Sequence, residues 1–129
     1  MSDDSLHSSG VVPPKLKGIP RLMAAARYSL AGLRAAFASE EAFRLEVIAL
    51  VVGTPLALLL GESAVEKVLL IGSLLLLMIV ELLNTGIEVL VNRVGADYHE
   101  LSGKAKDIGS AAVLVAMGMV AMVWLLLLL

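Results

Sequence analysis

Two glutamates and two asparagines interrupt the apolar stretch LLIGSLLLLMIVELLNTGIEVLVNRVG at residues 69–95, namely Glu81, Glu88, Asn84 and Asn92. At about 100° per residue on a helix, they fall within an arc of roughly 80° and form one polar stripe. A charged side chain at mid-membrane costs at least about 2.5–3.5 kcal/mol, so Glu81 is not expected to face lipid. We therefore expect the stripe to face protein or water.

The two carboxylates of this stripe suit a particular chemistry. Mg²⁺ favours one or two carboxylates together with phosphate oxygens and water, and a carboxylate with no metal beside it can accept the proton of a hydroxyl nucleophile. Glu81 lies about 10 Å from Glu88 along the helix axis, at roughly 1.5 Å per residue. This separation suits a metal and a phosphate at the membrane interface, with a lipid hydroxyl reached from deeper in the bilayer.

A purely structural stripe is the simpler alternative, because polar side chains can cross-link membrane helices through hydrogen bonds. That interpretation accounts for Asn84. It accounts less well for two glutamates, since carboxylates repel one another unless a cation lies between them. Glu88 could also extend to the interface as a snorkelling group. Glu81 is therefore the strongest candidate for a functional role.

Two further polar segments are expected at the same membrane level. In FASEEAFRLE, residues 37–46, Glu40 or Glu41 could cap a helix after Ser39 while the other completes a metal site. In NRVGADYHELSGKAKDIGSAAV, residues 92–113, Lys106 and Asp107 are either a topology signal with a helix N-cap or a functional pair. This segment does not match a P-loop, which needs glycine instead of tyrosine at its first position and Ser or Thr after the lysine.

The composition identifies the class of protein that must position these residues. Of the 129 residues, 59% are hydrophobic and 17% are charged, and the mean hydropathy is +0.92. These values are far above those of a soluble domain and predict an all-α integral membrane protein. The chain has no cysteine, which excludes disulfides and thiolate metal sites.

Three apolar segments, at about 43–61, 68–91 and 108–129, each have about the 20 residues that a helix needs to cross the hydrocarbon core. A further helix is expected at about 20–38, with Pro20 suited to its first position. Its apolar stripe consists of Leu22, Ala26, Leu30, Leu33 and Phe37. Such a helix is expected to lie on the membrane surface. Residues 1–18 are expected to be a disordered tail before a single membrane-embedded domain at 19–129.

The distribution of lysine and arginine predicts the orientation of the chain. Basic residues gather before the first span and in the loop at 92–107, whereas the loop at 62–67 contains only Lys67. By the positive-inside rule, the N-terminus and the second loop are then cytoplasmic. The polar end of the second span would therefore face the cytosol, where nucleotides are found.

Several segments resemble the prokaryotic integral-membrane diacylglycerol kinase family over about residues 20–125. They are ARYSLAGLRAAF, EEAFRLE, MIVELLNTGIEVLVNRVG and DYHELSGKAKDIGSAAVL. The resemblance implies a homotrimeric, multi-pass enzyme of the bacterial inner (plasma) membrane, dependent on ATP and Mg²⁺. It would phosphorylate the free hydroxyl of diacylglycerol to phosphatidic acid. Its partners would be lipid, ATP and other copies of the chain, and not nucleic acid.

The resemblance also implies roles for individual residues. Glu81 matches the catalytic base, Glu40 and Glu88 match the Mg²⁺ ligands, and Asn84 matches an active-site network. The ATP-contacting positions are matched by Arg21, Tyr28, Glu40, Glu88, Asp97, Tyr98, His99, Lys106 and Asp107. The substrate-contacting positions are matched by Arg21, Ser29, Arg34, Phe37, Ala42, Glu46, Glu81 and Ser110. Asn92 stands where members often have aspartate, so an essential charge is not implied there.

Phosphoryl transfer requires mainly positioning and charge neutralisation, so two carboxylates on Mg²⁺ with Lys106 on phosphate would be sufficient. Three spans are too few to enclose such a site, which we therefore expect between subunits. One alternative is an undecaprenol kinase of the same fold, although GSAAVL and YHELSGKAKD are closer to the diacylglycerol branch. Another is a small proton-coupled transporter subunit in which Glu81 binds protons. The cluster of carboxylates at the cytoplasmic edge argues against it.

Overall fold

The computed structural model describes residues 13–95 and 97–129. Over these residues it contains four α-helices, α1 (Ile19–Ser39), α2 (Glu41–Leu60), α3 (Ala64–Val94) and α4 (Glu100–Leu128). The predicted all-α fold class is confirmed. Most of the tail expected at 1–18 lies outside the described residues, and residues 13–17 have no regular secondary structure. The chain forms two compact units, one ending at Leu33 and the other comprising Arg34–Leu129.

The first unit contains most of α1, which starts immediately after a glycine with a positive φ. Gly18 has a φ of 69°, a conformation that glycine adopts without steric cost. Its carbonyl oxygen accepts hydrogen bonds from the backbone N–H groups of Arg21 and Leu22, at 3.1 and 3.2 Å. Gly18 therefore sets the direction in which the chain enters α1, and that entry places Arg21 in the first turn.

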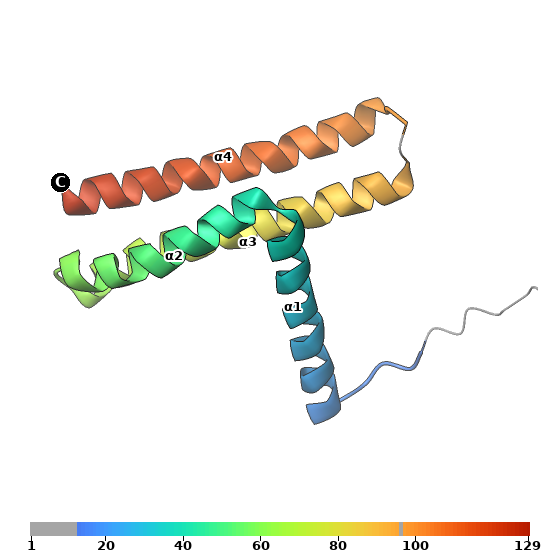
Figure 1. Cartoon of the computed structure of the whole chain (residues 1–129), viewed down its shortest axis with the longest axis horizontal. Helices are drawn as coiled ribbons and strands as arrows, with labels where there is room; N and C mark the ends of the chain where they lie inside the picture. Colours follow the sequence, from blue (N-terminus) through green and yellow to red (C-terminus); the bar gives the residue numbers. More distant parts are fainter. Residues whose placement is uncertain (1–12, 96) are drawn as a thin grey trace, which may run out of the picture. The chain divides into compact units, whose positions relative to one another are not determined.

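The second unit consists mainly of α2, α3 and α4, and α3 packs against both of the others. Figure 1 shows α4 running alongside α3, with a short loop joining them at one end. Because the connections at 61–63 and 95–99 are short, successive helices run antiparallel. The start of α2, the end of α3 and the start of α4 therefore lie at the same end of this unit.

α2, α3 and α4 are 20, 31 and 29 residues long and apolar enough to cross a membrane. α3 and α4 extend beyond the expected spans at the end where the loop joins them. The Ser63 hydroxyl caps α3 by accepting from the Glu66 N–H at 3.2 Å. The His99 Nδ1 atom caps α4 by accepting from the Leu101 N–H at 3.1 Å. The interpretation of Asp107 as a helix N-cap was therefore wrong, because α4 begins two turns earlier.

Tight packing far from the polar stripe holds the three helices of the second unit together. Leu70 of α3 and Ala57 of α2 are both fully buried, at 0% exposure. The indole Nε1 of Trp124 on α4 donates to the Leu70 carbonyl at 3.1 Å. A Cβ at Gly53 of α2 would lie 3.5 Å from the Trp124 ring and 2.7 Å from Leu74 Cδ1. Glycine at this position thus allows α2 to approach both other helices.

Candidate functional site

The polar stripe on α3 passes from buried to exposed along the helix. Glu81 and Asn84 are buried, with 5% and 8% of their surface exposed. Glu88 is half-buried, and Asn92 is exposed. Packing within one chain already covers Glu81 and Asn84. The location of the site between subunits stays a prediction.

Glu81 interacts electrostatically with other carboxylates of the second unit. The charges of Glu40, just before α2, and of Glu88 act on the Glu81 carboxylate, and the charge of Glu81 acts on the Glu46 carboxylate. Three of these residues come from α3 and the body of α2, and Glu40 immediately precedes α2. The antiparallel arrangement of α2 and α3 thus brings together acidic residues that are far apart in the sequence.

The Glu40 side chain is not used to cap α2. Glu40 occupies the N-cap position but makes no capping hydrogen bond through its side chain, while Glu41 lies in the first turn. The Glu40 Oε1 atom accepts a long hydrogen bond from the Ser39 hydroxyl at 3.5 Å. The Glu40 carboxylate thus carries no capping hydrogen bond that a ligand would have to replace.

The Asn84 side chain contacts Glu88 within α3 and also contacts α4. Its Nδ2 atom donates to the Glu88 Oε1 atom at 3.4 Å. Its Oδ1 atom is buried and has no hydrogen-bond partner among the described residues, as is also true of Thr85 Oγ1 and Glu46 Oε2. Asn84 Oδ1 lies against Gly109 of α4. Neither Thr85 nor Gly109 was predicted as a site residue, because neither residue type suggests chemistry by itself.

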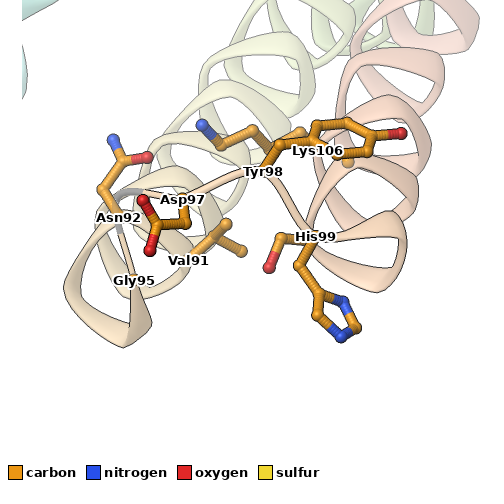
Figure 2. A pocket seen from close by; sticks show the side chains of 9 residues that line it. Val91, Asn92, Gly95, Asp97, Tyr98, His99 and Lys106 are labelled. Atoms are coloured by element: carbon orange, nitrogen blue, oxygen red, sulfur yellow. The ribbon is translucent and has the colours of Figure 1, made fainter.

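A hollow of about 480 Å³ lies at the junction of α3 and α4, within the range of small-molecule sites. It is lined by Val91, Asn92, Gly95, Asp97, Tyr98, His99, Ser102, Gly103 and Lys106. Four of the predicted ATP-contacting residues are thus brought together here. Asp107 is exposed and does not line it. Figure 2 shows the His99 imidazole pointing away from Asp97 and Lys106, consistent with its capping role on α4.

Three predicted site residues belong to the first unit. Arg21 and Tyr28 line a second hollow of about 750 Å³, together with Lys15, Lys17 and five apolar or proline residues. Ser29 does not line it, since its hydroxyl donates to the Ala25 carbonyl at 2.8 Å within α1. Arg21 and Lys17 give this hollow a basic wall.

The remaining substrate-contacting candidates lie on exposed surface. They are Arg34, Phe37, Ala42 and Ser110, whereas Glu46 is half-buried. Sequence reasoning missed Arg44, whose guanidinium Nη1 donates to the carbonyls of Phe37 and Ala38 at 2.9 and 3.2 Å. Arg44 thus ties the end of α1 to the start of α2, beside Glu40.

The carboxylates fit a magnesium ion that is shared with a phosphorylated ligand. No three histidine or acidic side chains of residues 13–95 and 97–129 form a metal site by themselves. Mg²⁺ usually keeps several waters and binds one or two carboxylates together with substrate phosphates, so a complete protein cage is not required. Glu40 and Glu88, whose charges both act on Glu81, supply hard oxygen donors of this kind.

Comparison with known proteins gives a consistent result. The family model described as prokaryotic diacylglycerol kinase matches residues 27–128. The diacylglycerol kinase of Escherichia coli is 50% identical over 111 residues, which cover 86% of this chain and 91% of that protein. The diacylglycerol kinase of Haemophilus influenzae is 46% identical, covering 85% and 93%. That of Pseudomonas aeruginosa is 49% identical, covering 83% and 87%.

Proposed function

Because this chain belongs to the prokaryotic diacylglycerol kinase family, we propose that it transfers the γ-phosphoryl group of ATP to the free hydroxyl of diacylglycerol. The products are phosphatidic acid and ADP. The observation that carries this function is the identity of about half of all residues to diacylglycerol kinases over most of the chain. The buried carboxylate of Glu81 supports it independently.

In the proposed reaction, Glu81 accepts the proton of the lipid hydroxyl. The hydroxyl oxygen forms a bond to the γ-phosphorus while the bond from that phosphorus to the bridging oxygen of ADP breaks. Glu81 suits this role because its carboxylate is buried in the apolar part of α3. Proton acceptance by a positioned carboxylate contributes typically about 10²–10⁴-fold to a rate.

Glu40 and Glu88 would hold Mg²⁺, and Lys106 would bind the phosphates of ATP. When bound, Mg²⁺ neutralises charge on the transferring phosphoryl group. Lys106 is half-buried and lines the hollow at the α3–α4 junction, so its ammonium group is available to a ligand there. Asp97 and Tyr98 line the same hollow and would contact the nucleotide. Arg21 and Tyr28 are proposed to contact ATP from the first unit.

The enzyme is proposed to work as a homotrimer in the inner membrane of a bacterium, with its N-terminus in the cytoplasm. The basic residues before α2 and in the α3–α4 loop support this orientation. The helix α1 is proposed to lie on the membrane surface. Leu22, Met23 and Leu30 have exposed apolar side chains that lipid would cover.

A comparison of lipid acceptors tests the function. Purified protein in mixed micelles, supplied with labelled ATP and Mg²⁺, is expected to label dioleoylglycerol far faster than undecaprenol. Preferential labelling of undecaprenol would show that the chain belongs to a polyprenol-specific branch of the fold. Failure to label either lipid would overturn the kinase function, and proton-coupled uptake would then become the function to measure.

A further inference from the structure

Gly109 lies at the point where α4 passes the polar stripe of α3, and it is buried. A Cβ atom at this position would overlap Asn84 Oδ1 and would lie 3.3 Å from Asn84 Cγ. Every residue other than glycine carries this atom. The lack of a side chain at Gly109 is therefore what lets the Asn84 carboxamide lie directly against α4.

The orientation of that carboxamide matters to Glu88. Asn84 Nδ2 donates to Glu88 Oε1 at 3.4 Å, one helical turn along α3. The amide nitrogen is a donor and the amide oxygen is an acceptor, so only the nitrogen stabilises a facing carboxylate. Asn84 Oδ1 occupies the space left by Gly109 and has no hydrogen-bond partner among the described residues. The space at Gly109 thus lets the carboxamide lie where its nitrogen can donate to Glu88.

The other glycines of α4 do not have this relation to the stripe. A Cβ at Gly118 would meet no atom within 4 Å, and one at Gly103 would make an ordinary contact of 3.6 Å with the Tyr98 ring. Among these three positions, only Gly109 is pressed against a side chain of α3. General flexibility of α4 therefore does not explain the glycine at 109.

We propose that Gly109 is a positioning residue for Glu88, because the space it leaves holds the Asn84 carboxamide with its nitrogen toward the Glu88 carboxylate. This inference rests on the proposed function, in which Glu88 is a ligand of Mg²⁺. Groups that orient a metal ligand typically change metal affinity about 10–100-fold when they are removed. An alanine at position 109 would displace Asn84 and leave Glu88 without its donor.

The test measures metal binding separately from catalysis. Mn²⁺, which gives an electron paramagnetic resonance signal, is titrated into the full-length protein in micelles with a non-hydrolysable ATP analogue. Gly109→Ala is expected to raise the Kd for Mn²⁺ roughly tenfold or more, whereas the matched control Gly118→Ala leaves it unchanged. Thermal unfolding of each variant shows whether it is folded.

Two outcomes separate this inference from the function on which it rests. If Glu88→Gln binds Mn²⁺ as tightly as the unmodified protein, the metal role of Glu88 is wrong and the role of Gly109 fails with it. If Glu88→Gln weakens Mn²⁺ binding but Gly109→Ala behaves like Gly118→Ala, the role of Gly109 is wrong while the metal role stands.

A double variant keeps the inference testable if Gly109→Ala does not fold. Asn84→Ala removes the carboxamide that would collide with the new methyl group. The double variant Asn84→Ala/Gly109→Ala is therefore expected to fold and to bind Mn²⁺ like Asn84→Ala alone. An additional loss of Mn²⁺ affinity or of folding in the double variant would mean that Gly109 acts through other contacts, and the inference would be wrong.

Discussion

Glu81 is a carboxylic acid at a depth where the neighbouring residues of α3 are apolar. Its side chain is 5% exposed, and the charges of Glu40 and Glu88 act on it. Such a group is costly to keep in a membrane protein, by at least about 2.5–3.5 kcal/mol when it is charged. A role as proton acceptor next to a bound cation gives a reason for this cost.

Replacement of Glu81 by glutamine tests that role. The amide has nearly the same shape but cannot accept the hydroxyl proton, so we expect Glu81→Gln to lower kcat by about 10²–10⁴-fold. Nucleotide binding and thermal unfolding in micelles should change little. Glu62→Gln, at an exposed position in the loop before α3, is the control and should keep full activity. Near-normal turnover of Glu81→Gln would contradict the proposed role.

Lys106 and Lys104 form a natural pair for testing nucleotide contacts. Lys106 is half-buried and lines the hollow, whereas Lys104 is exposed and does not. A hydrogen bond to a charged group contributes about 1.5–3 kcal/mol, which corresponds to roughly 10–100-fold in affinity. We therefore expect Lys106→Gln to raise the KM for ATP by about that factor and Lys104→Gln to leave it unchanged. Equal effects of the two substitutions in steady-state kinetics would argue against a specific phosphate contact.

At this scale, the sequence predicted the stripe and its acidic members but not their partners. The spacing of Glu81, Asn84 and Glu88 depends only on helical geometry, which is the same in every helix. The contact between Asn84 and Gly109 depends on how α3 and α4 are rotated about their axes. The burial of Glu81 within one chain depends on the same packing, and no residue pattern in the sequence specifies it.

The apolar pattern correctly predicted where the helices α2, α3 and α4 lie in the sequence, but it did not predict the residues at which α3 and α4 begin and end. Hydropathy shows where the chain becomes polar. A helix ends elsewhere, at the point where its terminal backbone N–H and C=O groups form hydrogen bonds with partners outside the helix. α4 therefore begins at Glu100, well before the apolar segment that starts at Ile108. Its cap is the His99 imidazole, a residue outside the usual set of Ser, Thr, Asp and Asn. For this reason the apolar pattern left a cap role open for Asp107, which lies inside α4.

The contact of α2 with α3 and α4 at Gly53 can be tested through stability. A Cβ at this position would lie 2.7 Å from Leu74 Cδ1, and inserting extra methyl groups into a packed core typically costs about 1–3 kcal/mol. We expect Gly53→Val to lower the free energy of unfolding by about this amount, measured by denaturation in micelles. The Kd for Mn²⁺ of the folded fraction should not change, because Gly53 is remote from Glu88 along the helices.

Gly118→Val is the matched control for this substitution. A Cβ at Gly118 would meet no atom within 4 Å, so the added side chain has no neighbour to displace within the chain. Its free energy of unfolding is expected to stay within about 0.5 kcal/mol of the unmodified value. Equal destabilisation by valine at both positions would indicate loss of a general helix property instead of crowding at Gly53.

For the molecule as a whole, the antiparallel order of α2, α3 and α4 places Glu40, Glu88 and the start of α4 at the same end of the second unit. The absence of cysteine makes this arrangement easy to test by labelling single introduced cysteines. We expect Glu62→Cys to react with a membrane-impermeant maleimide on intact cells. Lys104→Cys should react only after the membrane is permeabilised. The reverse pattern would place the loop, and the proposed site with it, outside the cell.

Trp124 is the only tryptophan in the chain. Its indole donates a hydrogen bond to the Leu70 carbonyl, and its ring lies next to Gly53. Its ultraviolet fluorescence therefore comes from a single place where three helices meet, roughly 16 Å along α3 from Glu81 at about 1.5 Å per residue. The emission wavelength reports how polar the surroundings of the indole are, without any dye or added label. A change in this fluorescence when nucleotide is added would show that nucleotide binding alters the packing of the three helices around Trp124.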